Sequence, residues 1–166
     1  MPETTSGNPV TITTPTDEQI LITREFDAPK HLVYKAWTTP ELVRRWWAGR
    51  RGTVDSVEID LRVGGRWRYV LTANGGFQVA FHGEYREIVP NERIVTTEVY
   101  ESPEAAGHEA PLNIITFEET DGRTTLRLLT QTSTKELRDL ILRSGMEVGV
   151  REQMEILDEL TRSLAA

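Results

Sequence analysis

The chain has 166 residues, of which 38% are hydrophobic and 27% are charged, so we expect it to fold around one hydrophobic core. It contains no cysteine, which excludes disulfides, thiol nucleophiles and cysteine-ligated metal centres, and its three scattered histidines do not favour a metal site. Nineteen Lys and Arg against 26 Asp and Glu give a net charge of −7, which disfavours nucleic acids and anionic membranes as partners.

Residues 1–17 are rich in Thr, Pro, Glu, Ser and Gly, and such a composition buries too little apolar area to fold. It predicts a disordered N-terminal tail, followed by a single domain over residues 18–166. The N-terminus has no basic, apolar leader, and no apolar run approaches the ~20 residues that cross a bilayer. We therefore expect a soluble, cytoplasmic protein.

A strand and two short helices are predicted after the tail. Residues 20–26 alternate as in a strand, and Pro29 suits the first position of a helix. Apolar residues then recur at helical spacing from 32 to 47. Thr39 and Pro40 predict a break between two helices, with Thr39 as the N-cap of the second.

From residue 57 the apolar period changes to two, which is typical of strands. Alternating runs predict six further strands, at 57–61, 67–71, 77–89, 94–100, 112–119 and 124–132. The clearest turn is Asp121-Gly122, a dipeptide favoured in two-residue hairpins. The short connections indicate that most of these strands pair antiparallel.

The C-terminal part is predicted to hold a short helix and then a long one. Ser133 with Glu136, and Ser144 with Glu147, fit capping boxes at the two starts. The long helix has an apolar stripe opposed by charged residues that include Asp158. The predicted fold class is α+β, in which a curved, seven-stranded antiparallel sheet of order β-α-α-β6-α wraps around the C-terminal helix.

This order resembles the helix-grip fold of the START and birch-pollen-allergen (SRPBCC) superfamily. Four segments resemble its bacterial branch named after the activator of the heat shock protein 90 ATPase: residues 29–47, GGRWRY at 64–69, HGEYREIVPNERIV at 82–95 and SGMEVG at 144–149. The resemblance covers roughly residues 19–166. It implies a superfamily whose members bind lipids or polyketides, cyclise or hydrolyse ligands, or activate chaperones.

Our first hypothesis is that the protein binds a small hydrophobic ligand, lipid-like or aromatic, between the sheet and the long helix. Strand parity and the helix stripe select the residues that would line this cavity: Trp67, Tyr69, Phe77, Val79, Phe81, Ile114, Met146, Val150 and Met154. The alternative is that the same side chains simply pack the core, as we expect for Leu126 and Leu128. No cofactor is implied.

Two further hypotheses rest on polar residues. The basic cluster Arg44, Arg45, Arg50 and Arg51, beside Trp46 and Trp47, is either a solvated helix end or a patch for an anion or an acidic partner, as in a chaperone-activator-like module. The other expected partner is a second copy of this chain, in a homodimer.

The third hypothesis is a cavity-based cyclase or hydrolase. His82 and Glu84 share one strand face, and with Tyr69 or Tyr85 they offer an acid and a base. The alternative is a solvated His–Glu pair, and the sequence favours a binding protein over an enzyme because no set of mutually positioned catalytic groups is evident.

Overall fold

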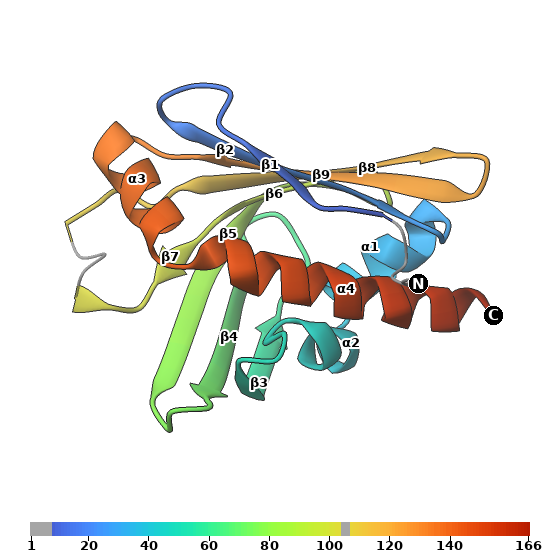
Figure 1. Cartoon of the computed structure of the whole chain (residues 1–166), viewed down its shortest axis with the longest axis horizontal. Helices are drawn as coiled ribbons and strands as arrows, with labels where there is room; N and C mark the ends of the chain where they lie inside the picture. Colours follow the sequence, from blue (N-terminus) through green and yellow to red (C-terminus); the bar gives the residue numbers. More distant parts are fainter. Residues whose placement is uncertain (1–7, 104–106) are drawn as a thin grey trace, which may run out of the picture.

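The computed structural model describes residues 8–103 and 107–166. Within them, an antiparallel sheet is combined with four helices (Figure 1). The strands are β1 (Thr11–Thr13), β2 (Gln19–Phe26), β3 (Gly52–Ile59), β4 (Arg66–Ala73), β5 (Gln78–Val89), β6 (Arg93–Thr97), β7 (Val99–Tyr100), β8 (Leu112–Thr120) and β9 (Arg123–Gln131). The helices are α1 (Lys30–Thr38), α2 (Pro40–Trp46), α3 (Lys135–Arg143) and α4 (Met146–Ala165).

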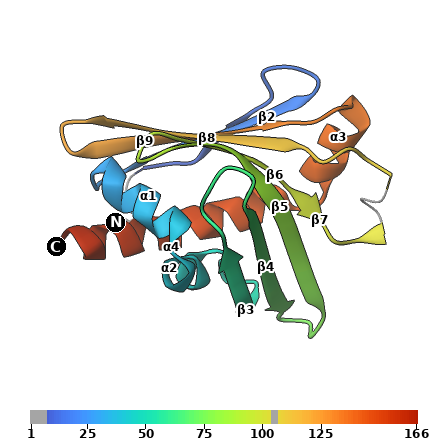
Figure 2. The same cartoon turned by 180° about the vertical axis from the view of Figure 1, so that it is seen from behind.

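The sheet runs in the order β1-β2-β9-β8-β6-β5-β4-β3, and β7 pairs with β5 beside this path. One end of the long strand β5 pairs with β6, and the other end pairs with β4 and β7. The two parts of the sheet diverge from β5, and α4 lies in the angle between them, with α1 and α2 beside it (Figures 1 and 2). This is the helix-grip arrangement that the sequence predicts.

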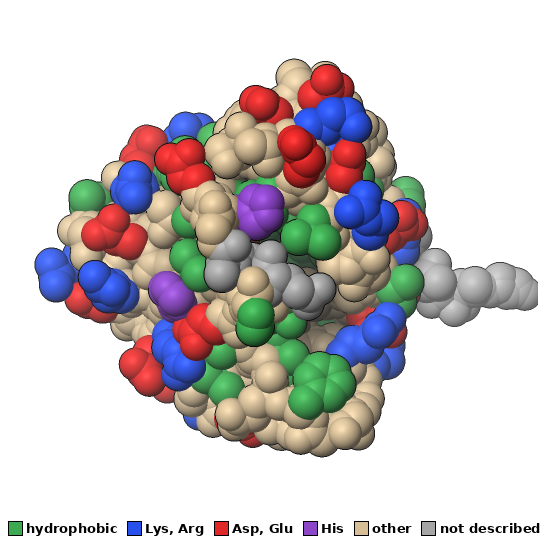
Figure 3. Space-filling view, turned by 90° about the vertical axis from the view of Figure 1, so that its left-hand side faces the viewer, with side chains coloured by type: hydrophobic (Ala, Val, Ile, Leu, Met, Phe, Trp, Pro, Cys, Tyr) green, Lys and Arg blue, Asp and Glu red, His purple; other side chains and the backbone are tan. Residues whose placement is uncertain are grey.

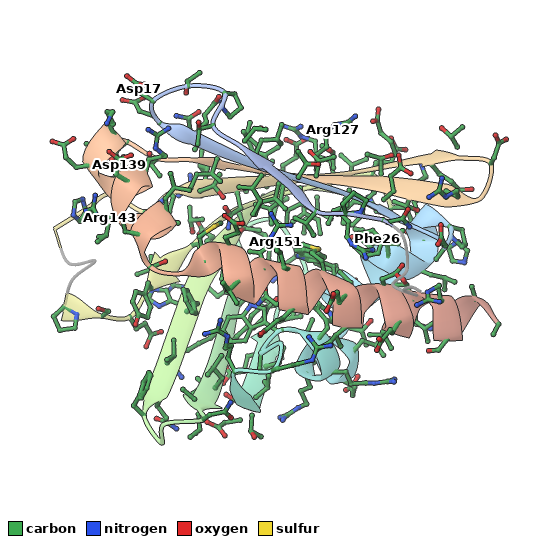
Figure 4. All side chains as sticks on the ribbon, viewed as in Figure 1. Asp17, Phe26, Arg127, Asp139, Arg143 and Arg151 are labelled. Carbon is green, nitrogen blue, oxygen red and sulfur yellow. The ribbon has the colours of Figure 1, made fainter. Side chains whose placement is uncertain are left out.

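The core lies between the sheet and α4, where apolar side chains from both layers meet. Its fully buried members include Ile20, Phe26, Val33, Val43, Leu126, Met154 and Leu157. Burying each such side chain contributes about 1.5–3 kcal/mol. In Figure 4, Phe26 lies on the side of the sheet that faces α4, whereas Arg127 lies on the opposite, outer side.

The predicted strands and turns are largely confirmed. At the β8–β9 hairpin, Asp121 and Gly122 have φ values of 54° and 77°, which two-residue hairpin turns require. The run predicted over 94–100 is two strands, β6 and β7, because the chain changes partner between them. The strand predicted to begin at Val57 begins at Gly52 instead.

The N-terminal prediction is wrong in part. Residues 11–13 were expected to lie in a disordered tail, yet they form β1, which pairs with residues 21–23 of β2. The alternation of Thr and Ile suits an edge strand despite the polar composition around it. Residues 1–7 of the predicted tail lie outside the described residues.

The helix starts differ from the predictions by one residue. Pro29 is the N-cap of α1, not its first residue, whereas Thr39 caps α2 as predicted. The N-cap of α3 is Thr134 instead of Ser133, and its side chain accepts a hydrogen bond from the Leu137 amide at 3.1 Å.

The start of α4 also differs from its prediction. Ser144 ends α3, and the N-cap of α4 is Gly145, whose φ of 85° favours glycine. The Ser144 hydroxyl donates back to the Ile141 carbonyl at 2.6 Å, so it does not serve as a capping-box acceptor for α4. None of the helices in residues 8–103 and 107–166 is long and apolar enough to cross a membrane.

An ion pair is buried between β2 and α4. Arg24 Nη1 lies 3.4 Å from Asp158 Oδ1, and the two side chains are 2% and 1% exposed. The expectation that Asp158 lies on the charged outer face of α4 is therefore wrong: the helix turns this carboxylate towards the sheet, where Arg24 occupies an inward position between Ile22 and Phe26.

Candidate ligand-binding site

Five aromatic rings form a continuous chain along the inner side of β4, β5 and β7. Trp67 lies 4.7 Å from Tyr69 between ring centroids, and Tyr69 lies 5.2 Å from Trp47. Trp47 in turn lies 5.4 Å from Phe81, which stacks on Tyr100 at 4.9 Å. Aromatic rings in such contact give a large apolar surface with defined geometry.

Strand register and one loop place these rings. Tyr69 and Phe81 are direct partners across β4 and β5, and Phe81 is also opposite Tyr100 of β7. Trp47 follows the last residue of α2, and its carbonyl accepts a hydrogen bond from Gln153 of α4. The aromatic chain is therefore connected to the long helix at its middle ring.

Gly83 leaves room for the closest approach in this region. It is the next inward position on β5 after Phe81 and pairs with Trp67. A Cβ at Gly83 would lie 1.9 Å from the Thr97 carbonyl oxygen and 2.6 Å from Trp67 Nε1. Only glycine therefore lets the end of β6 and the Trp67 indole pack over β5 here.

One aromatic polar group in this interior lacks a hydrogen-bond partner within the described residues, and two buried tyrosines lie near it. Trp67 Nε1 is buried and makes no hydrogen bond there. The Tyr69 and Tyr85 side chains are 8% and 4% exposed, and burial raises the pKa of both. Both are therefore neutral and able to donate a hydrogen bond at pH 7.

A chain of polar side chains reaches the same interior from β8 and β9. The Thr130 hydroxyl donates to Asn113 Oδ1 at 2.7 Å, and the Asn113 amide donates to Glu98 Oε1. Glu98 is half-buried between β6 and β7, and burial raises the pKa of its carboxyl, while the Asn113 hydrogen bond opposes this shift. Burial raises the pKa of Tyr69 first, and the charges of Tyr85 and Glu98 add to this shift.

The sequence matches a known protein family over most of its length. Residues 27–162 match the model of the family described as activator of Hsp90 ATPase homolog 1-like protein. The chain belongs to this family. No curated protein matches the chain.

Solved structures share the fold of this Hsp90 ATPase homolog 1-like chain. Protein Ms6760 from Mycobacterium smegmatis is 24% identical, with a TM-score of 0.82, 92% of this chain covered and 96% of that one. A Rhodobacter sphaeroides protein is 22% identical, with a TM-score of 0.85 and coverages of 93% and 99%. Protein CV1439 from Chromobacterium violaceum is 26% identical, with a TM-score of 0.76 and coverages of 88% and 98%.

In this member of the activator of Hsp90 ATPase homolog 1-like family, most of the predicted lining residues face the interior. Trp67, Tyr69, Phe81, Met146, Val150 and Met154 all belong to the core or pack against it, as do Leu126 and Leu128. Val79 is half-buried near the tip of the β4–β5 hairpin. Which of these side chains touch a ligand stays a prediction.

Two predicted lining residues do not face the interior. Phe77 is 63% exposed because it lies in the turn before β5, not on the strand. Ile114 lies on the outer face, opposite Leu129, because β8 turns Asn113 and Ile115 inward instead. Ile114 and Ile115 are adjacent and equally apolar, so the alternating pattern alone could not show which of them faces inward.

Two arginines of the basic cluster form ion pairs with glutamates of α4. Arg50 Nη1 lies 3.2 Å from Glu155 Oε1, and Arg51 Nε lies 3.3 Å from Glu152 Oε1. Arg44 donates to the Val54 carbonyl at 3.3 Å. Much of the cluster's charge is thus matched within this chain, which weakens the case for a patch that recognises an acidic partner.

The two tryptophans beside this cluster are not surface residues. Trp46 is 3% exposed, its ring packs on Trp37, and its indole nitrogen donates to the Ala36 carbonyl at 3.0 Å. Trp47 is half-buried within the aromatic chain. Of the two tryptophans, the structure therefore buries Trp46 and leaves Trp47 partly exposed.

The predicted contact between His82 and Glu84 does not form. His82 Nδ1 lies 2.7 Å from Glu101 Oε2, and Arg68 contacts the same carboxylate at 2.9 Å, whereas Glu84 pairs with Arg86. Arg68 first, and then His82, hold the pKa of Glu101 at about 2. The arrangement is an exposed ion-pair cluster on the outer face, with no nucleophile among its members.

Two surface grooves of about 320 Å³ lie on the outer face of the sheet. One includes Arg66, Arg68, His82 and Glu101, and the other includes Glu92, Arg93, Thr116 and Arg127. Within residues 8–103 and 107–166, no group of three or more His, Asp or Glu side chains is placed to hold a metal ion.

Sequence reasoning missed Glu98, Asn113 and Thr130 as site residues. Glu98 lies at the junction of β6 and β7, inside a run that alternates like one continuous strand. Asn113 shares the inward parity of Ile115 and Phe117, so an asparagine in an otherwise apolar row is the signal that would have indicated a buried polar group.

Proposed function

We propose that this protein binds a small, largely aromatic molecule between α4 and the inner faces of β4 and β5. The observation that carries the proposal is Trp67 Nε1, which is buried next to the aromatic chain and makes no hydrogen bond in the described part of the chain. An unsatisfied buried polar group costs about 1–3 kcal/mol, so a buried indole N–H is expected to find a partner, which a ligand would supply.

This combination is typical of ligand sites, which are mostly apolar with a few convergent polar groups. The edges and faces of Trp47, Trp67 and Phe81 offer contact to a flat ring, and the two tyrosine hydroxyls offer hydrogen bonds to its substituents. Family membership supports the same reading through the fold, in which a sheet grips a helix.

We expect a ligand to reach this interior from the end where α3 and β7 lie. Hydrophobic side chains gather in the middle of that face, among charged ones (Figure 3). Tyr100, the last ring of the aromatic chain, is 39% exposed, so the chain of rings extends from the interior to the surface. A ligand would enter along these rings.

The test is equilibrium dialysis of 2-acetonaphthone against the full-length protein and two variants. Val150 of α4 packs against the core, so Val150→Trp should fill the space beside the rings and abolish binding. Val148, on the same helix, is 50% exposed, so Val148→Trp is the matched control and should bind like the wild type. Equal binding by all three proteins would refute the proposal.

Native mass spectrometry of the purified protein, after exposure to a cell lysate, tests the proposal with natural ligands. Comparing the intact mass with the denatured mass should reveal a released small molecule in the wild type and none in Val150→Trp. A bound molecule that is returned chemically changed would favour the cyclase or hydrolase alternative over a carrier. The same adduct on both proteins would contradict the proposed location.

A further inference from the structure

The outer face of the sheet carries an apolar patch that is separate from the core. The strand register pairs Leu21 of β2 with Leu129 of β9, Leu129 with Ile114 of β8, and Ile114 with Val95 of β6. These four side chains therefore form one row across four neighbouring strands, and Leu112 of β8 lies beside Ile114 on the same face. We call these five residues the outer patch.

No helix of the described chain covers the outer patch. The helices α1, α2 and α4 lie on the opposite side of the sheet, and α3 lies at its end (Figures 1 and 2). Leu21, Leu112, Ile114 and Leu129 are half-buried, yet they neither belong to the core nor pack against it, whereas the neighbouring Leu128 does pack against it. A contiguous apolar patch on a sheet face, bordered by polar residues, is typical of an interaction site.

The charges along one border of the outer patch are balanced within the chain. This border is the row of Arg93, Thr116 and Arg127, which are register partners across β6, β8 and β9. Arg93 forms an ion pair with Glu87 at 3.1 Å, and Arg127 forms one with Glu118. Paired charges of both signs disfavour a nucleic acid, an anionic membrane or a strongly charged protein as the occupant of this face.

The opposite border is uncharged and complements the arginine row. Gln19, Gln131, Leu112 and Thr97 are register partners across β2, β9, β8 and β6. A two-fold axis along the outer patch places this uncharged row of one copy over the arginine row of the other. Arginine N–H groups then meet amide and hydroxyl oxygens, and no like charges face each other.

From this geometry we infer that the outer patch is the interface of a homodimer, in which the outer faces of two sheets pack together about this two-fold axis. The strands β2, β8 and β9 have 8, 9 and 9 residues. Together with β6 they form a face of about 500 Å² in projection, at ~3.3 Å per residue and ~4.8 Å per strand. This approaches the ~600 Å² per partner of the smaller specific interfaces, so we expect dissociation at micromolar concentrations.

Sedimentation velocity of the full chain over a micromolar concentration series tests the inference. The wild type should shift from monomer to dimer as its concentration rises, and high salt should preserve the dimer because the central contact is apolar. Ile114→Glu places a charge at the centre of the interface, so it should weaken dimerisation by at least about tenfold. Val148→Glu is the matched control, because Val148 is an exposed residue of α4 outside the patch, and it should dimerise like the wild type.

Chemical cross-linking locates the interface even if Ile114→Glu does not fold. The chain contains no cysteine, so one substitution supplies a unique thiol. Packed sheets lie about 10 Å apart, so a short bismaleimide should link two copies of Ile114→Cys. It should not link two copies of Val148→Cys.

Four results would overturn the inference. The first is a wild-type chain that stays monomeric throughout the concentration series, and the second is a dimer that dissociates in high salt. The third is a folded Ile114→Glu variant that dimerises like the wild type. The fourth is cross-linking of Val148→Cys as efficient as that of Ile114→Cys. None of these results bears on the ligand site, which lies on the other side of the sheet.

Discussion

The buried ion pair between Arg24 and Asp158 makes a strong prediction about stability. Asp158→Ala should lower the free energy of unfolding by about 3–5 kcal/mol, because it leaves a buried guanidinium without its carboxylate. Both side chains are at most 2% exposed, and at 3.4 Å their attraction is about 5 kcal/mol at an effective dielectric constant of 20. Burial lowers the pKa of Arg24, and Asp158 opposes that shift, as expected for a cation that depends on its partner.

Urea unfolding followed by circular dichroism measures the effect, and a double-mutant cycle isolates it. The pair Arg24→Met and Asp158→Leu should recover most of the loss, since two apolar side chains leave no unpaired charge in the core. Arg162 also contacts Asp158, at 3.2 Å, but its side chain is 46% exposed. Arg162→Ala should therefore cost less than about 1 kcal/mol and serves as the surface control.

A loss below about 1 kcal/mol for Asp158→Ala would refute the reasoning, because a buried arginine that loses its carboxylate is expected to cost several kcal/mol. Additive effects of the two single substitutions would also contradict it, since residues in direct contact are expected to couple. Either result would mean that α4 can turn or shift enough to hydrate Arg24.

Three smaller predictions concern single positions. Gly83→Ala should destabilise the protein by at least about 1–3 kcal/mol, because its Cβ would meet a backbone carbonyl. Gly149→Ala should stabilise the protein by about 0.5–1 kcal/mol, because this glycine lies in open space on α4. Thermal unfolding measures both changes in stability. Thr134→Ala should cost about 1 kcal/mol as the true N-cap of α3, and Ser133→Ala nearly nothing in the same assay. The ion pairs of Glu101 lower its pKa to about 2, so its ionised form stabilises the folded protein. The wild type should therefore be more stable than Glu101→Gln above about pH 5, and this difference should disappear as the pH falls towards 2. Acid titration of both proteins measures the difference.

The order of elements was predictable from the sequence because it depends on local periodicity. Alternating residues give Trp67, Tyr69 and Phe81 one shared face, and the structure places all three towards the core. The break at Thr39-Pro40 follows from the missing N–H of proline and is equally local. These features need no knowledge of which strands become neighbours.

Features that depend on neighbouring strands were not predictable in this way. The inward parity of β8 is set by its pairing with β6 and β9, which buries Ile115 and leaves Ile114 outside. β1 was missed because its stability comes from pairing with β2 and not from its composition. Arg24 did carry a usable signal, since an arginine at an inward strand position requires a buried acid, and α4 supplied one.

The two groups of buried polar residues differ in how their members are paired. Near α1, Arg24 and Asp158 form a buried ion pair, and the Arg24 guanidinium lies 5.1 Å from the centroid of the Phe26 ring. Near α3, Glu98 has one oxygen held by Asn113 and the other without a partner in the described residues. Removing one partner of a buried ion pair leaves a charge in the core, whereas a single polar group in an apolar interior is available to a ligand. The α3 end is therefore where substitutions should change affinity more than stability, and the α1 end is where they should do the reverse.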